Sequence, residues 1–110
     1  MKLQPKPFQR IAREEKTIEL RLNDEKRKMI NVGDTIIFTN IDDNDSKISA
    51  VVVKLHRFDS FRQLYDMLPL DKCGYLSDEI DTASPLDMEA YYSIDKQSQY
   101  GVLGIEIKLS

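Results

Sequence analysis

Three charged residues, Lys16, Glu19 and Arg21, lie close together in a segment that reads EEKTIELRLND from residue 14 to residue 24. The alternation of apolar and polar residues there predicts a β-strand over residues 17–22. On such a strand Glu19 and Arg21 project to the same side, about 7 Å apart at ~3.3 Å per residue. Lys16 comes just before the strand, where the backbone can turn its ammonium group towards them. The spacing predicts a charged cluster on a rigid element.

Each member of this cluster could contribute to binding or to chemistry. Arg21 offers a planar fork that suits phosphate or carboxylate groups. Lys16 offers a point charge, or a nucleophile or base if burial lowers its pKa. Glu19 could accept hydrogen bonds from ligand amides or hold the two cations in place. The spacing alone leaves the ordinary alternative open, since alternating charges also coat the solvated faces of strands.

The elements around this cluster predict an α+β fold in which strands predominate. Ile18, Leu20 and Leu22 supply the apolar face of the first strand, and Asn23 and Asp24 end it. We expect helices over residues 7–15 and 61–68 and a third that begins at Ser84-Pro85 and carries Leu86, Met88, Tyr91 and Tyr92. We expect further strands over 35–41, 47–58 and 101–109, a hairpin turn over 42–46, one helical turn within 25–30, and irregular structure over 69–84.

The strand predicted over residues 47–58 indicates how the sheet is covered. Its centre, Ala50 to Val53, is apolar at four consecutive positions. Such a run suits a strand that is covered on both faces. The pattern therefore favours a small mixed β-barrel of about five strands with flanking helices, and an open α+β sandwich is the competing topology.

Length and composition indicate one soluble globular domain over residues 1–110. The chain is 41% hydrophobic and 32% charged, which is ordinary for that class. No stretch approaches the ~20 apolar residues of a membrane-spanning helix, and no apolar run follows the N-terminal lysines. We therefore expect a cytoplasmic protein with no membrane partner, and the sequence leaves its oligomeric state open.

The charge distribution bears on the class of partner. The formal net charge is −3, so the chain as a whole is not a basic nucleic-acid binder. Residues 1–28 nevertheless carry nine Lys and Arg residues against five Asp and Glu, whereas residues 29–110 carry seven against fourteen. A positive patch built from the first segment could meet an anionic partner.

The sequence predicts no metal and no cofactor. Cys73 and His56 are the only residues of their types, and zinc sites take three or four ligands. We expect a structural or incidental role for Cys73 and a structural or exposed position for His56. No GxGxxG motif or Walker loop is present, so nucleotide-phosphate cradles of those types are not predicted.

Four segments together resemble one family. Residues 16–21 read KTIELR, which is similar to the core of the GxKxxExR motif of ASCH domains, the activating-signal-cointegrator homology family. The later segments VGDTIIF (32–38), FDSFR (58–62) and YGVLGI (100–105) resemble that family's strand and helix signatures in the same order. The resemblance covers most of the chain and implies a fold like that of PUA domains.

The resemblance also implies that Lys16, Glu19 and Arg21 line a cleft, and it associates the family with RNA. On this basis we expect a binding module for RNA or a nucleotide-like small molecule. Lys16 and Arg21 would contact phosphate or a base edge, and Tyr100 or the Tyr91-Tyr92 pair would stack on a base.

Two positions depart from the family patterns. Glu14 stands where the motif has glycine, and it would place a negative charge near the cleft rim. Glu19 stands where the small amidohydrolases of the family have a nucleophilic threonine. The alternative hypothesis is a small hydrolase, amidohydrolase or ribonuclease-like, that acts on a modified nucleoside or RNA, with Lys16 as the activated group and Glu19 as proton carrier. A third possibility is a partner-binding or regulatory protein whose cleft holds a small anion.

Overall fold

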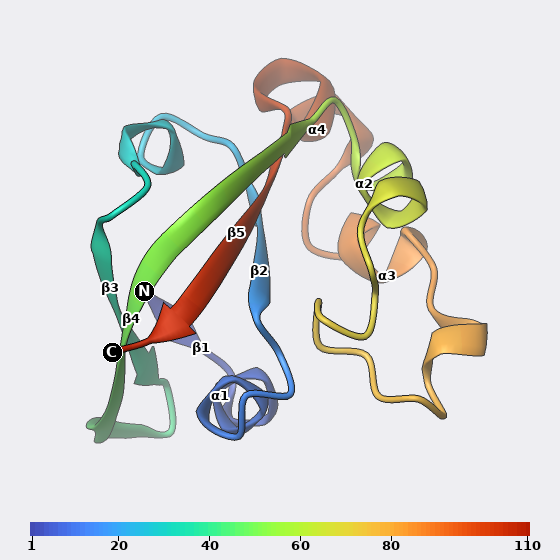
Figure 1. The fold of residues 1–110 in the computed structure, drawn as a ribbon. Helices are drawn as coiled ribbons and strands as arrows, with labels where there is room; N and C mark the ends of the chain where they lie inside the picture. The colour runs from blue at the N-terminus through green and yellow to red at the C-terminus, as the bar shows by residue number, and fades with distance from the viewer.

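The computed structural model describes residues 1–110 and contains one five-stranded sheet that curls into a half-barrel (Figure 1). The strand order is β1-β3-β4-β5-β2, and only the pairing of β1 with β3 is parallel. The strands are β1 (Lys2–Leu3), β2 (Ile18–Leu22), β3 (Thr35–Asn40), β4 (Asp43–Phe58) and β5 (Val102–Leu109). The predicted α+β fold, mainly β and with about five strands, is confirmed, and the curl of the sheet decides against the open sandwich.

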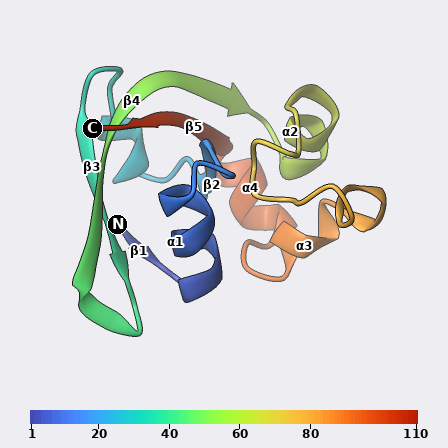
Figure 2. The same ribbon diagram turned by 60° about the horizontal axis from the view of Figure 1, so that its bottom comes forward.

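Four α-helices and two short 3-10 helices complete the chain. These are α1 (Pro5–Ala12), η1 (Arg27–Met29), α2 (Phe61–Met67), η2 (Ile80–Thr82), α3 (Leu86–Glu89) and α4 (Ile94–Tyr100). Figure 2 shows α1 inside the curve of the sheet, with α2, α3 and α4 grouped beyond β2. None of the helices has the length and apolar character that a membrane crossing requires.

Two apolar cores hold these elements together. The first joins α1 to the sheet through residues such as Ile11, Phe38 and Ile105, which are fully or almost fully buried. The second packs Ile18, Leu20 and Leu22 of β2 against α2 and its neighbours. The predicted apolar face of β2 is thus confirmed. The opposite face of β2, which carries Glu19 and Arg21, lies between the two cores.

The prediction of the chain after residue 84 was wrong in detail. Instead of one helix that carries Tyr91 and Tyr92, α3 ends at Glu89 and a second helix, α4, follows. Ser93 begins α4, because its side-chain hydroxyl accepts a hydrogen bond from the Lys96 amide. The buried Gln97 then ties α4 to α2 by accepting from the Phe61 amide. Sequence reasoning missed α4 because its residues, IDKQSQY, contain no apolar stripe.

Two predictions about β4 were also wrong. The strand begins at Asp43 rather than Lys47, and Asp43 pairs with Asn40. The pairing with β3 is irregular between Asp43 and Lys47, where the register shifts. The run from Ala50 to Val53 is not covered on both faces, because Val53 is 42% exposed. The pairing with β5 shifts between Val52 and Lys54, which places Val53 at a β-bulge with no partner opposite.

Candidate functional site

A cleft of about 510 Å³ opens between α1, β1 and β2 on one side and the segment 73–92 on the other. Five cationic side chains line it, and three carboxylates share the space. The cations are Lys2, Lys6, Arg10, Lys16 and Arg21, and the carboxylates are Glu19, Glu79 and Asp87. The structure therefore brings together three of the four predicted site residues, Lys16, Glu19 and Arg21, and the cleft carries a positive excess.

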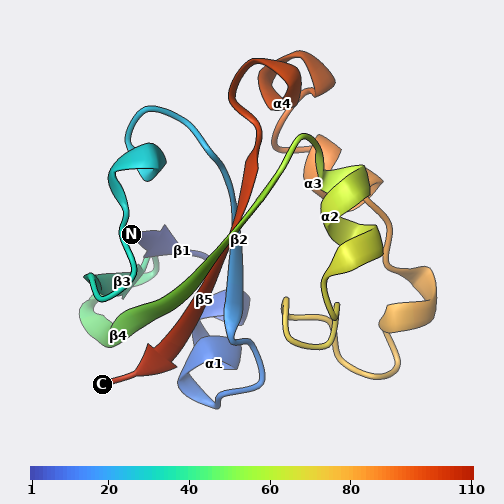
Figure 3. The ribbon, with the colours of Figure 1, turned by 45° about the horizontal axis from the view of Figure 1, so that its top comes forward.

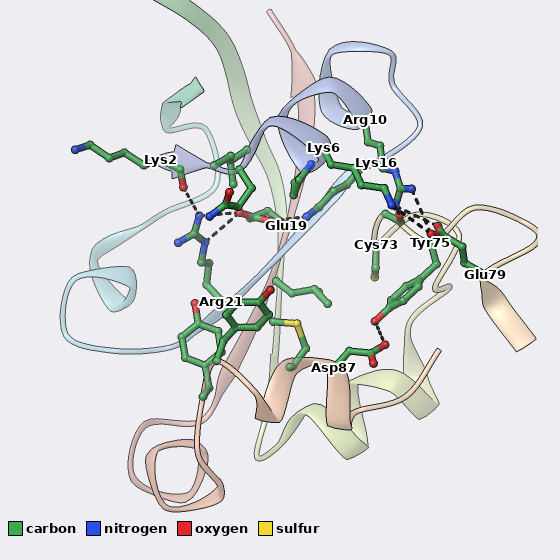
Figure 4. A pocket seen from close by; sticks show the side chains of 18 of the residues that line it. Lys2, Lys6, Arg10, Lys16, Glu19, Arg21, Cys73, Tyr75, Glu79 and Asp87 are labelled. Atoms are coloured by element: carbon green, nitrogen blue, oxygen red, sulfur yellow. Dashed lines mark hydrogen bonds and ion pairs between the residues drawn. The ribbon is translucent and has the colours of Figure 1, made fainter. Parts of the chain in front are cut away.

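Glu19 lies between Lys16 and Arg21 (Figure 4). The Lys16 Nζ donates to Glu19 Oε1 at 2.7 Å, and the Arg21 Nε donates to Oε2 at 3.0 Å. Glu19 is only 3% exposed. Burial by itself would raise the pKa of Glu19, but the charges and hydrogen bonds of Lys16 and Arg21 outweigh it and hold that pKa below its ordinary value. The carboxylate is therefore ionised and anchors both cations.

Arg21 also connects the two edges of the half-barrel. Its Nη2 donates to the backbone oxygen of Lys2 at 2.9 Å. Because β1 and β2 are the outermost strands of the sheet, this hydrogen bond fixes β1 against the face of β2 that carries the cluster. The rigid sheet thus positions the Arg21 guanidinium at the mouth of the cleft.

Gly74 determines the path of the Lys16 side chain. Gly74 has a φ of +108°, in the region that favours glycine. A Cβ atom at this position would lie 3.0 Å from Lys16 Cδ, so a larger residue would press on the lysine stem. Glycine lets the stem pass close to the backbone on its way to Glu19.

Arg10 is a cleft residue that sequence reasoning missed. Its Nη1 donates to the backbone oxygen of Gly74 and lies 3.1 Å from Glu79 Oε1. The amide of Leu76 and the guanidinium of Arg10 together lower the pKa of Glu79. Arg10 thereby clamps the segment 74–79 against α1. The only signal in the sequence was the positive excess over residues 1–28, which did not single out Arg10.

Aromatic side chains form the wall opposite α1. The hydroxyl groups of Tyr65 and Tyr75 lie 2.6 Å apart, and Tyr75 donates to Asp87 Oδ2 at 2.8 Å. Burial raises the pKa of Tyr65 to about 12 and also raises the pKa of Tyr75, so both hydroxyls act as neutral hydrogen-bonding groups. The predicted stacking pair Tyr91 and Tyr92 also lines the cleft. Tyr92 stacks on Phe61, whereas Tyr91 is 78% exposed.

Tyr100, the fourth predicted site residue, does not line this cleft. It lines a second hollow, where its ring lies beneath the ammonium groups of Lys28 and Lys96. A ligand contact at Tyr100 would therefore lie in the second hollow, apart from the cluster on β2.

The lone Cys73 and His56 occupy different settings. Cys73 lines the cleft but is 5% exposed, and burial raises the pKa of its thiol to about 12. It is therefore a protonated, packed side chain rather than a nucleophile. His56 lies outside the cleft lining, with Nε2 2.9 Å from Glu106 Oε1. No three His, Cys, Asp or Glu side chains lie together as a metal ion would need.

Glu14 has an unusual backbone. It is the only residue other than glycine with a positive φ, which is 60°. The amides of Glu14 and Glu15 donate to the carbonyls of Ile11 and Arg10, which is the hydrogen-bond pattern of a Schellman motif at the end of α1. Glu14 does not line the cleft and instead borders a smaller hollow. The expected negative charge at the cleft rim is thus not provided by Glu14.

Comparisons with known proteins agree with this fold. A family model for the ASCH domain matches residues 1–110. The crystal structure of hypothetical protein PH0355 is 28% identical, with a TM-score of 0.79 over 100% of this chain and 96% of the other. The solution structure of protein PF0455 from Pyrococcus furiosus is 29% identical, with a TM-score of 0.68 over 99% of this chain and 94% of the other. Among curated proteins, none matches this sequence.

Proposed function

The chain belongs to the ASCH domain family, and from this premise we propose that its cleft binds a nucleotide-like anion, either as a free nucleotide or as one unit of an RNA. The observation that carries the proposal is the convergence of Lys16, Arg21 and a tyrosine-lined wall in one cleft of about 510 Å³. That volume lies within the ~300–1,000 Å³ of typical small-molecule sites.

The cations keep donors free for a ligand. Lys16 uses one of its three N–H groups on Glu19, and Arg21 uses its Nε and Nη2 on Glu19 and the Lys2 backbone. The remaining N–H groups of Lys16 and Arg21 suit the oxygens of a phosphate. Glu19 serves to hold these two cations in position, because both of its oxygens already accept from them.

The exposed rim of the cleft supplies the other contacts of the proposal. Lys6, whose side chain is 72% exposed, adds positive charge near Arg10. Tyr91 is exposed and available to stack on a base. Stacking on an aromatic ring tolerates any base, so the proposal assigns the cleft to nucleotides as a class.

The alternative hydrolase requires Glu19 to carry a proton. Neither oxygen of Glu19 is free of a cation, and its pKa is lowered. A carboxylate in that state is a weak base and is rarely protonated near neutral pH. The geometry therefore favours binding over hydrolysis.

Calorimetric titration with nucleoside monophosphates and short single-stranded RNA at low salt tests the proposal. We expect binding that weakens as salt rises. Lys6→Ala should weaken it about threefold or more by removing one exposed cation near the phosphate. Lys47→Ala, which removes an exposed cation outside the cleft, should leave it unchanged. Absence of binding at low salt, or equal losses in the two variants, would contradict the proposal.

A further inference from the structure

A second hollow, of about 740 Å³, lies between the end of β4, the start of α2 and the end of α4. Its polar and aromatic lining includes Asn23, Arg57, Asp59, Gln99 and Tyr100. Figure 3 shows α4 at the upper ends of β2 and β5, with α1 at the opposite end of the sheet. The second hollow is therefore distinct from the cleft, and it reaches the chain just after the end of β2 at Asn23.

Tyr100 is the aromatic group of this hollow. Its ring is half-buried and packs against the second apolar core. Lys28 Nζ lies 5.9 Å and Lys96 Nζ 5.7 Å from the ring centroid. Lys28 belongs to η1 and Lys96 to α4, so the fold brings two cations from distant segments to one tyrosine. Both lysines are exposed, and their ammonium groups can turn from the ring to a phosphate.

Two other polar side chains of the hollow, Arg57 and Asn23, have charged or polar atoms without a partner in the structure. Arg57 is exposed and makes no salt bridge, and Asp59 is the one carboxylate in the lining. The side-chain oxygen of Asn23 is buried and accepts no hydrogen bond. A buried acceptor without a donor is unfavourable.

The cleft and the second hollow border neighbouring residues of the chain. Arg21 lines the cleft, and Asn23, two residues later, lines the second hollow. At strand spacing these two residues are about 7 Å apart along the chain. The two hollows therefore border neighbouring parts of the chain, at Arg21 and at Asn23.

We propose that the second hollow binds the neighbouring nucleotide of a single-stranded RNA whose first nucleotide occupies the cleft. Tyr100 stacks on the base, and Lys28 and Lys96 contact the phosphate. This inference rests on the proposed function of the cleft and adds a partner to it, a strand rather than a free nucleotide. Stacking on tyrosine combined with cations along the backbone is a general mode of single-strand binding.

Fluorescence titration of the full chain with a labelled RNA hexamer and with a labelled mononucleotide tests the inference. The hexamer should bind more tightly than the mononucleotide. Tyr100→Leu, which keeps apolar packing, should weaken the hexamer on the order of tenfold and leave the mononucleotide unchanged. The double variant Lys28→Ala/Lys96→Ala should lower the slope of log affinity against log salt by about one for the hexamer. Lys47→Ala is the matched control.

The outcomes separate this inference from the proposed function. Suppose that Lys6→Ala weakens the binding of both ligands, while Tyr100→Leu and the double lysine variant leave the binding of the hexamer unchanged. The inference about the second hollow is then overturned, and the proposed function of the cleft is retained. If Tyr100→Leu weakens the hexamer while the mononucleotide does not bind, the second hollow is supported and the cleft is not. Because Lys28 and Lys96 are exposed, the double variant keeps the test decisive even if Tyr100→Leu does not fold.

Discussion

Lys16 and Glu19 form an ion pair with 2.7 Å between Nζ and Oε1, and both side chains are almost withdrawn from solvent, at 11% and 4% exposure. A pair so enclosed differs from the charge pairs that coat an exposed strand, because each partner depends on the other for its solvation. Arg21 completes the arrangement from the other side of Glu19. The consequences for stability follow from this dependence.

Glu19→Gln should destabilise the fold. The substitution leaves Lys16 and Arg21 close together without an anion, and removal of one partner from a buried ion pair costs about 3–5 kcal/mol. Chemical denaturation should therefore show a loss of about 3 kcal/mol or more in the free energy of unfolding. Glu15→Gln, at an exposed position beside the same strand, should change it by less than about 0.5 kcal/mol. Equal stability of Glu19→Gln and the unsubstituted chain would contradict this account of the pair.

The same carboxylate should make stability depend on pH. The folded pKa of Glu19 lies below its ordinary value of 4.5, so the folded state favours the ionised form. The contribution of Glu19 to the free energy of unfolding is complete when the pH lies above the pKa of the unfolded state. This contribution is lost as the pH falls through the pKa of the folded state. Melting temperatures measured from about pH 7 to about pH 3 should fall more steeply below about pH 4.5 in the unsubstituted chain than in Glu19→Gln. Glu79 adds to the slope in both proteins, so the difference between them isolates Glu19. Parallel curves would exclude the assignment.

Glu14→Gly should stabilise the protein. Glu14 has a φ of 60° at the end of α1, and the left-handed conformation costs a residue with a Cβ about 1–2 kcal/mol. Part of this gain is offset because glycine loses more backbone entropy on folding, so we expect a net gain of about 0.5–1 kcal/mol. Thermal unfolding should show a rise of a few degrees. Glu15→Gly, at the next position and with no positive φ, should give no rise. A lower melting temperature for Glu14→Gly would refute the strain argument.

The faces of β2 could be predicted from the sequence alone. Successive side chains of a strand point to opposite sides, so the alternation in β2 correctly predicted that Ile18, Leu20 and Leu22 would share a face. Periodicity could not show that the opposite face, with Glu19 and Arg21, would be buried, because the cover comes from β1, α1 and the distant segment 73–92. The family resemblance supplied that expectation instead.

The positions of Arg10 and Tyr100 could not be predicted from sequence, because each depends on contacts between distant segments. Arg10 contacts Gly74 and Glu79, which lie more than sixty residues later in the chain. No local sequence pattern indicates contacts of this kind. Tyr100 was predicted to stack on a base of the ligand, and the unpredicted helix α4 places it in a hollow separate from the cluster on β2. Residues within one strand could be placed from sequence, whereas partners across loops could not.

Gly74→Ala should weaken both stability and ligand binding. A Cβ at residue 74 meets the Lys16 stem at 3.0 Å, and the φ of +108° is unfavourable for alanine. We expect a loss of about 1–3 kcal/mol in the free energy of unfolding, the usual range for backbone strain. Since Lys16 must move, affinity for nucleotide should also fall. Gly33→Ala is the matched control, because Gly33 also has a positive φ but meets no atom within 4 Å. Gly33→Ala should show the strain without the loss of affinity, and equal losses of affinity in both variants would contradict the role of Gly74.

Arg10→Ala should expose Cys73 to chemical labelling. Cys73 is 5% exposed and its pKa is raised to about 12, so a thiol reagent should react slowly with the folded protein near neutral pH. Arg10 donates to the backbone oxygen of Gly74, the residue next to Cys73. A hydrogen bond from a charged donor contributes about 1.5–3 kcal/mol, so its loss should raise the labelling rate through local opening on the order of tenfold. Lys6→Ala removes only a 3.8 Å contact with Glu79 and should leave the rate nearly unchanged. If Arg10→Ala labels no faster than Lys6→Ala, the segment 74–79 is held in place by contacts other than the Arg10 clamp.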